Sequence, residues 1–253
     1  MKYIWDIDPV AISILGLDVR WYGLAYVLGF FFALWFGQRH LKTFGLEISK
    51  PEFENMVFGV FFSGVLGGRI GEFLFYSPST FWTNPVEILK VWHGGMSIHG
   101  GLLLAVIFLV VFCRKRKIPI FKILDLLVIP LAIALVFGRL ANFINGELVG
   151  VPTDQTWGVV FPHVDEFLRH PSQLYEVVKN FVLAGILIFC FKKNKHLQEG
   201  FLFTVFLFFY GVFRFFIEFV READGVIWFF STGQVLCIIM AGAAILIARQ
   251  KKL

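Results

Sequence analysis

Residues 121–147 read FKILDLLVIPLAIALVFGRLANFINGE, and this stretch decides which class of protein the chain forms. A largely apolar run from Ile123 to Phe137 is followed closely by Arg139, two asparagines and Glu147. An arginine at the centre of a membrane helix costs roughly 2.5–3.5 kcal/mol on insertion scales, so such residues normally have partners and functions. Arg139 is therefore a candidate site residue, unless its side chain only reaches toward the lipid headgroups as an anchor.

The whole chain has the composition of a protein with several membrane spans. Of its 253 residues, 58% are hydrophobic, 16% are charged, and 33 are phenylalanine. Because a bilayer needs about 20 apolar residues per helix, the apolar stretches predict an all-α polytopic membrane protein with seven transmembrane helices. Residues 1–253 would form a single integral membrane domain. The predicted spans are residues 21–38, 54–76, 93–112, 121–140, 172–191, 199–220 and 231–248.

Basic residues in the connecting loops predict the orientation, because cytoplasmic loops carry the excess of Lys and Arg. One set of alternate connections contains 14 of these residues, against five in the other set. The richer set consists of Arg39, Lys42, Lys50, Arg114, Lys115, Arg116, Lys117, Lys122, Lys192, Lys193, Lys195, Arg249, Lys251 and Lys252. The C-terminus should therefore be cytoplasmic and the N-terminus outside. These inner loops account for the net charge of +5 without a nucleic-acid partner.

The longest connection lies between the fourth and fifth predicted spans. Residues 143–171 contain three prolines, Trp157 and several acidic residues, with little periodicity. Loops of this length are usually functional or disordered. The aromatic content favours an ordered lid on the outer surface.

Polar side chains inside the predicted spans fall at one level of the membrane. Given the orientation above, each lies in the outer half of its span, and five different spans contribute. The set comprises Tyr22, Tyr26, Arg69, Glu72, His99, Arg139, Asn142, Tyr210, Arg214 and Glu218. The last three are spaced by four residues, which places them on one face of a helix. This convergence predicts a site near the outer surface.

Two arginines in a lipid-facing site indicate an anionic ligand, and phosphate is the obvious one. The guanidinium forks of Arg139 and Arg214 match phosphate oxygens and stay charged at any relevant pH. Asn142 and Asn145 would add neutral donors. Arg69 lies three residues before a glutamate, so the two could instead pair only to neutralise each other during insertion.

His99 lies among four glycines in the string GGMSIHGG, residues 94–101, about six residues into the predicted span 93–112. Glycine lets a backbone approach a ligand closely, and histidine is the side chain best suited to moving a proton near neutral pH. A lone histidine in an apolar span can also be a packing residue. The glycines and the shared level with the arginines favour a chemical role.

Several strings together resemble the prolipoprotein diacylglyceryl transferases of bacteria. The most specific are HGGL at 99–102, GRLANFINGE at 138–147 and RHPSQLYE at 169–176. The strings WYGL at 21–24, GGRIG at 67–71 and YGVFR at 210–214 match in the same order, so the resemblance covers almost the whole chain. The chain departs from the family pattern at Ala141, where glycine is usual, and at His93, where many members have aspartate.

The resemblance implies a seven-helix enzyme of the bacterial inner membrane. Its N-terminus and the loop 143–171 would be periplasmic, its C-terminus cytoplasmic, and its active site would face the periplasm. Such enzymes transfer the diacylglyceryl group of phosphatidylglycerol to the thiol of the lipobox cysteine in the signal peptide of a preprolipoprotein, and glycerol-1-phosphate leaves. No cofactor is implied, and no metal-ligand spacing appears in the sequence.

Family pattern and chemistry together give the expected roles. The catalytic residues would be His99, Arg139, Arg214, Glu147 and Glu218, with His99 as the first choice for the base that takes the thiol proton. The substrate-binding residues would be Tyr22, Tyr26, Arg69, Asn142, Asn145, Gly150 and Tyr210.

Other classes of protein fit the sequence less well. A transporter of lipid or anionic solutes with an outward-facing arginine site needs polar residues toward both faces, and here Asp125 and Lys179 are the exceptions to an outer cluster. An intramembrane serine protease would need a glycine after Ser97, which is absent. A non-catalytic anchor would leave the intramembrane arginines unexplained.

Overall fold

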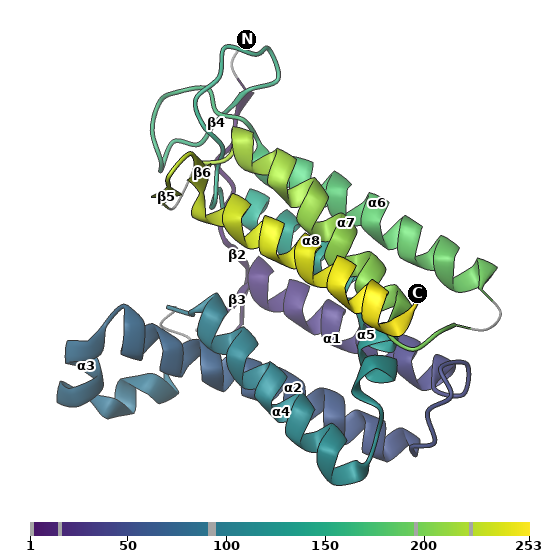
Figure 1. Cartoon of the computed structure of the whole chain (residues 1–253). Coiled ribbons are helices and arrows are strands. Elements are labelled where there is room, and N and C mark those ends of the chain that lie inside the picture. Colours follow the sequence, from purple (N-terminus) through teal and green to yellow (C-terminus); the bar gives the residue numbers. More distant parts are fainter. Residues whose placement is uncertain (1–2, 15–16, 91–94, 195–196, 223–224) are drawn as a thin grey trace. The chain divides into compact units, whose positions relative to one another are not determined.

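The computed structural model describes residues 3–14, 17–90, 95–194, 197–222 and 225–253. The chain is mostly helical (Figure 1). It forms two compact units: Met1–Phe36 together with Leu124–Leu253, and Gly37–Ile123.

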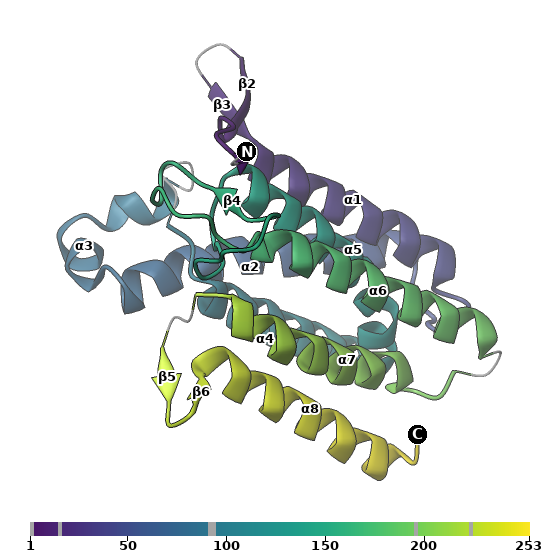
Figure 2. The ribbon, with the colours of Figure 1, turned by 90° about the horizontal axis from the view of Figure 1, so that it is seen from above.

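The first unit contains most of the helices. Its elements are β1 (Tyr3–Ile4), β2 (Val10–Ile14), β3 (Leu17–Arg20), most of α1 (Trp21–His40) and α5 (Ile120–Ile144), β4 (Val159–Val160), α6 (Ser172–Lys193), α7 (Phe201–Ile217), the 3₁₀ helix η3 (Glu218–Val220), β5 (Val226–Ile227), β6 (Phe230–Ser231) and α8 (Thr232–Lys251). Helices α6, α7 and α8 lie side by side in sequence order in both views (Figures 1 and 2).

The packing of this unit follows from small and apolar residues at the helix contacts. A Cβ on Gly29 of α1 would come within 2.8 Å of the Ala134 Cβ of α5, so the two helices approach closely there. Leu183 and Leu187 of α6 are fully buried. Asp125 of α5 accepts hydrogen bonds from the backbone N–H groups of Gly200 (2.6 Å) and Phe203 (2.8 Å), at the start of α7. Asp125, one of the two polar residues that the transporter alternative would have needed, thus caps a helix.

The connection between α5 and α6 forms a lobe that packs with the N-terminal segment. Strand β1 pairs in parallel with β4, and Trp5 packs against Phe143, with the ring centroids 4.3 Å apart. Phe161 is fully buried in the same cluster. The Arg169 guanidinium bonds the Asp165 carboxylate at 2.5 Å and holds the pKa of that carboxyl below its usual range.

The second unit is built on a pair of long helices. It contains α2 (Lys50–Phe75), α3 (Pro78–Thr83), the 3₁₀ helix η1 (Pro85–Leu89) and α4 (Ile98–Arg116), and α2 packs along α4. A Cβ on Gly67 would come within 2.4 Å of the Gly100 carbonyl oxygen, and one on Gly71 within 2.8 Å of the Gly100 Cα. These glycines let two helix backbones meet, the usual role of small residues in membrane helices.

The expectation of a polytopic membrane protein is confirmed in its main point. Within the described residues, six helices are long and apolar enough to cross a membrane: Lys50–Phe75, Ile98–Arg116, Ile120–Ile144, Ser172–Lys193, Phe201–Val220 and Thr232–Lys251. Helix α1 corresponds to the predicted span 21–38 but is not one of these six. Its tryptophan, tyrosine and glycine residues contribute little hydropathy, although aromatic rings suit the membrane interface.

The fold is mostly helical, as the all-α prediction expects, but it also contains a few short strands. The described residues include three two-stranded sheets, β1 with β4, β2 with β3, and β5 with β6. Their strands have two to five residues. Strands this short give no periodic hydrophobic signal that a sequence reading could detect.

Candidate functional site

A single carboxylate, Glu176 of α6, organises the polar cluster of the first unit. Its side chain is 2% exposed and lies within ion-pair distance of four cations from three helices and the segment after η3. The distances are 2.7 Å to Lys179 Nζ, 3.2 Å to Arg214 Nε, 3.7 Å to Arg139 Nε and 4.0 Å to Arg221 Nη1. The two arginines that the sequence singled out are therefore brought together at one counter-ion.

Arg139 also begins a hydrogen-bonded chain that leads to α1. Its Nη1 donates to Asn142 Oδ1 at 3.3 Å, and Asn142 Nδ2 donates to the Tyr22 hydroxyl at 3.0 Å and to Glu147 Oε2 at 3.3 Å. Asn145 Nδ2 donates to the other Glu147 oxygen at 3.1 Å. Four predicted site residues, Arg139, Asn142, Asn145 and Glu147, therefore lie at the end of α5 or just after it. Asn142 links them to a fifth, Tyr22 of α1.

Arg214 is held from its other side by Glu218. Their Nη1 and Oε2 atoms are 2.5 Å apart, the i, i+4 pairing expected from the spacing. Ser231, the N-cap of α8, donates its hydroxyl to Glu218 Oε1 at 3.0 Å. Glu218 is 7% exposed, and a Cβ on Gly233 would collide with its carboxylate, so the absence of a side chain at Gly233 makes room for it.

The remaining aromatic residues line the same cluster. The ring of Tyr210 lies under the Lys179 ammonium, with Nζ 3.9 Å from the ring centroid. Tyr26 packs against Tyr22, with ring centroids 5.4 Å apart, and 59% of Tyr26 is exposed. Tyr26 is therefore placed beside the hydrogen-bonded chain and remains open to a ligand.

The charge balance of the cluster favours an anion. Four cations, Arg139, Lys179, Arg214 and Arg221, lie at Glu176, Arg214 also pairs with Glu218, and Asn142 links Arg139 to Glu147, so four positive charges face three negative ones. Burial, together with the charges of Arg214 and Arg139, lowers the pKa of Arg221. The guanidinium of arginine is normally protonated at any relevant pH. The unbalanced positive charge would be relieved by a bound phosphate.

Gly150 lies at the edge of this arrangement, in the lobe. Its N–H donates to the His170 carbonyl oxygen at 3.0 Å, and its own carbonyl oxygen accepts from Arg169 Nη1 at 2.9 Å. A Cβ there would lie 2.5 Å from the Val220 carbonyl oxygen. Close backbone packing explains glycine at this position, and the expected role in substrate binding stays a prediction.

Arg69, in the second unit, is 2% exposed and organises the chain between α2 and α4. Its guanidinium donates to the carbonyl oxygens of Glu87 (2.6 Å), Gly95 (2.9 Å), Lys90 (3.0 Å) and Ile88 (3.2 Å). These contacts support a structural role for Arg69, and its expected part in substrate binding stays a prediction.

His99, also in the second unit, lies nearer the N-terminal end of its helix than expected. Helix α4 begins at Ile98, where Ser97 caps it by accepting from the Gly100 N–H at 3.3 Å, so His99 is in the first turn rather than six residues down. The cause is local: Gly95 has a φ of +73°, which favours an irregular backbone before the cap. His99 is exposed within its unit. His93 is outside the described residues.

Three members of the cluster received no role from the sequence: Glu176, Lys179 and Arg221. Glu176 lies inside the RHPSQLYE string, and Lys179 lies in the same predicted span. An ionisable residue inside a membrane span is a functional candidate by default, and that signal was available for both. Arg221 carried no comparable signal, because it follows the end of its span and reads as a loop residue.

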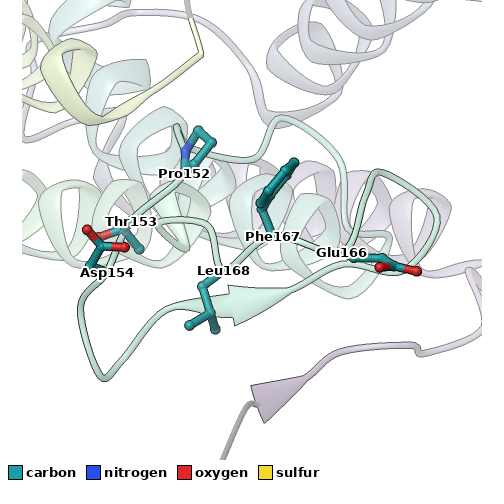
Figure 3. Close-up of a pocket in the computed structure, with 6 residues that line it drawn as sticks. All are labelled: Pro152, Thr153, Asp154, Glu166, Phe167 and Leu168. Carbon is teal, nitrogen blue, oxygen red and sulfur yellow. The ribbon is translucent and has the colours of Figure 1, made fainter.

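A surface pocket in the lobe does not suit an anion. It is lined by Pro152, Thr153, Asp154, Glu166, Phe167 and Leu168. Its only charged lining residues are acidic, and Figure 3 shows them on opposite sides of Phe167. A phosphate would be repelled there, so the cluster around Glu176 is the better candidate site.

Comparisons with known proteins show which family the whole chain resembles. The sequence model of the family described as prolipoprotein diacylglyceryl transferase matches residues 9–249. Proteins named phosphatidylglycerol–prolipoprotein diacylglyceryl transferase are similar over most of their length. That of Ehrlichia ruminantium (strain Gardel) is 42% identical over 98% of both chains. That of Aeromonas salmonicida (strain A449) is 39% identical over 98% of this chain and 92% of its own. That of Wolbachia pipientis subsp. Culex pipiens (strain wPip) is 43% identical over 93% of this chain and 91% of its own.

The family match spans nearly all described elements, from β2 to α8, and it includes every member of the Glu176 cluster. Identities near 40% extend over 98% and 92% of the length of the first two relatives and over 98% of this chain, so lobe, helices and site all fall within the aligned region. This chain belongs to the prolipoprotein diacylglyceryl transferase family.

Proposed function

We propose that this protein transfers the diacylglyceryl group of phosphatidylglycerol to the thiol of a lipobox cysteine in a preprolipoprotein signal peptide. Glycerol-1-phosphate is the second product. The enzyme is a membrane-bound transferase that acts in the first step of lipoprotein lipidation, and it needs no cofactor.

The observation that carries this proposal is the pairing of Arg139 and Arg214 at one buried counter-ion. Their Nε atoms are 3.7 Å and 3.2 Å from opposite oxygens of Glu176, so both guanidinium groups face the same small region. Guanidinium forks bind phosphate oxygens in pairs. A phosphodiester headgroup entering from the membrane would meet both arginines at once.

The charge change in the reaction explains why such a cluster would accelerate it. The cysteine sulfur forms a bond to the terminal glycerol carbon of the diacylglyceryl group, and the bond from that carbon to the phosphate oxygen breaks. The thiol proton passes to a base, and the departing phosphate gains one negative charge. Preorganised cations stabilise charge that develops in a transition state, which is the role proposed for Arg139 and Arg214.

The other site residues divide into proton transfer and binding. His99 remains the first choice for the base, because free cysteine, with a pKa near ~8.5, is only partly ionised at neutral pH. Glu147 and Glu218 are the alternatives, and each is held in place by hydrogen bonds from Asn142 and Asn145 or from Ser231. Tyr22, Tyr26 and Asn142 would contact the lipid headgroup.

The proposed topology has seven spans, with α1 added to the six apolar helices. The N-terminus and the lobe 143–171 lie in the periplasm, and the C-terminus lies in the cytoplasm of a bacterial inner membrane. The support is the distribution of Lys and Arg among the loops. The acyl chains stay in the bilayer while the headgroup enters the site from the side.

The direct test is incubation of the purified protein with a lipobox peptide in vesicles that contain phosphatidylglycerol, followed by mass analysis of the peptide. A mass increase of one diacylglyceryl group on the cysteine is expected. Vesicles of phosphatidylcholine alone and a peptide with serine in place of cysteine are the controls. Unmodified peptide in phosphatidylglycerol vesicles, from protein that is inserted and folded, would refute the proposal.

A further inference from the structure

Lys179 is a buried cation that the proposed chemistry does not use. It lies in α6, a helix long and apolar enough to cross a membrane, and its side chain is 3% exposed. Ionisable residues in such helices are costly and usually functional. The contacts of Lys179 indicate what that function is.

The Lys179 ammonium holds one oxygen of Glu176. Its Nζ donates to Oε2 at 2.7 Å and lies 3.9 Å from the centroid of the Tyr210 ring. Within the described part of the chain, this is the one hydrogen bond that the Glu176 carboxylate receives, because Oε1 has no hydrogen-bond partner. Arg139 and Arg214 approach the same carboxylate as ion pairs only.

We propose that Lys179 is a positioning residue that keeps Glu176 from binding the two arginines too tightly. A carboxylate that is free to turn forms two parallel hydrogen bonds with a guanidinium fork. Such a pair would occupy the donors that the lipid phosphate needs. With Oε2 held by Lys179, Glu176 keeps Arg139 and Arg214 in place by charge, and the guanidinium N–H groups that do not face Asn142 or Glu218 stay available for the phosphate. This inference rests on the proposed function.

Two substitutions separate positioning from simple charge. Lys179→Met keeps an unbranched side chain, one atom shorter than lysine, but removes both the donor and the charge. Lys179→Gln removes the charge and keeps a hydrogen-bond donor for Glu176 Oε2. If Lys179 acts by holding Glu176 in position, the glutamine variant should recover most of the phosphatidylglycerol binding that the methionine variant loses.

The experiment measures transfer to a lipobox peptide and, independently of turnover, retention of phosphatidylglycerol by native mass spectrometry. For Lys179→Met, the KM for phosphatidylglycerol should rise about tenfold or more, the effect of one charged hydrogen bond. Retention should fall in parallel, while kcat changes less. Lys179→Gln should lie close to the wild type in both measurements.

Asn180→Leu is the matched control. Asn180 is the neighbouring residue in α6 and is 0% exposed, and in the described part of the chain its amide has no hydrogen-bond partner. Its replacement should leave KM and retention unchanged.

Three results would overturn the inference: a Lys179→Met protein with wild-type KM and retention, a glutamine variant as impaired as the methionine variant, or an equal defect in Asn180→Leu. A wild-type protein without transferase activity would instead refute the proposed function. In that case, phosphatidylglycerol retention still tests the role of Lys179.

Discussion

At the scale of single residues, Glu176 determines how the cations of the site are arranged. A buried carboxylate with four cations around it fixes their positions, and removing one member of a buried charge network leaves the others uncompensated. The predicted residues Arg139 and Arg214 were found because each interrupts or ends an apolar run. Glu176 lies in the first turns of α6, where its significance depends on which helices pack against it. Sequence spacing along one helix could not supply that information.

Substitution of either arginine should damage transfer even when charge is kept. Arg139→Ala and Arg214→Ala should slow the reaction roughly 10²–10³-fold, the usual effect of losing one preorganised donor. Arg139→Lys and Arg214→Lys should also be strongly impaired, because an ammonium cannot replace a guanidinium fork. Initial rates in phosphatidylglycerol vesicles test this, with membrane insertion of each variant checked in parallel. Near-normal transfer by both lysine variants would exclude a bidentate phosphate clamp.

His99→Gln should bind lipid but transfer slowly at neutral pH. General-base help is worth roughly 10²–10⁴-fold, and glutamine keeps a hydrogen bond but cannot accept the proton. The deficit should shrink as pH rises from about 6.5 to 9, because the free cysteine thiol titrates near ~8.5 and then supplies its own thiolate. Rates measured across this range at saturating lipid are the test. A deficit that stays constant with pH would assign His99 to lipid positioning and leave Glu147 or Glu218 as the base.

At the scale of elements, helix ends position the site. The C-terminal end of α5 and the residues that follow it hold Arg139, Asn142 and Glu147, and the start of α8 holds Glu218 through Ser231. The seven helical segments were predicted from apolar length alone, with ends a few residues from those observed. The largest difference, at the start of α4, arises because Ser97 caps the helix after a glycine-rich segment.

Asp125 should stabilise the fold without taking part in catalysis. Its carboxylate accepts from two backbone N–H groups at the start of α7, and Asp125→Ala would leave these donors unsatisfied. Hydrogen bonds to charged groups contribute about 1.5–3 kcal/mol, so the melting temperature in detergent should fall clearly. The KM for phosphatidylglycerol in the remaining folded protein should be unchanged. If Asp125→Ala kept a normal melting temperature but abolished movement of lipid across vesicle membranes, the transporter alternative would be supported instead.

At the scale of the whole molecule, the sequence predicted a membrane protein with several helical spans and most members of the cluster, including Tyr22, Asn142, Arg214 and Glu218. It did not predict the three small sheets: β1 pairs with β4, which is far away in the chain, and the other two sheets are hairpins of very short strands. It also assigned no role to Glu176, Lys179 or Arg221. Roles of that kind depend on helix packing, which periodicity and composition do not encode.

The topology should place the C-terminus in the cytoplasm. Loop arginines and lysines number 14 on that side against five on the other. A reporter that is active only in the periplasm, fused after Lys252, should be silent, and one active only in the cytoplasm should work. The reverse result would put the cluster of arginines on the cytoplasmic side and remove the basis for a periplasmic active site.

The most direct measurement counts both products of one reaction. Protein in phosphatidylglycerol vesicles is given a lipobox peptide, and the thioether-linked peptide and the released glycerol-1-phosphate are quantified together. The proposed chemistry predicts equal amounts of the two products from the wild type, and both formed roughly 10²–10³-fold more slowly by membrane-inserted Arg214→Ala protein. Phosphate release without modified peptide, or modified peptide formed equally well without Arg214, would contradict it.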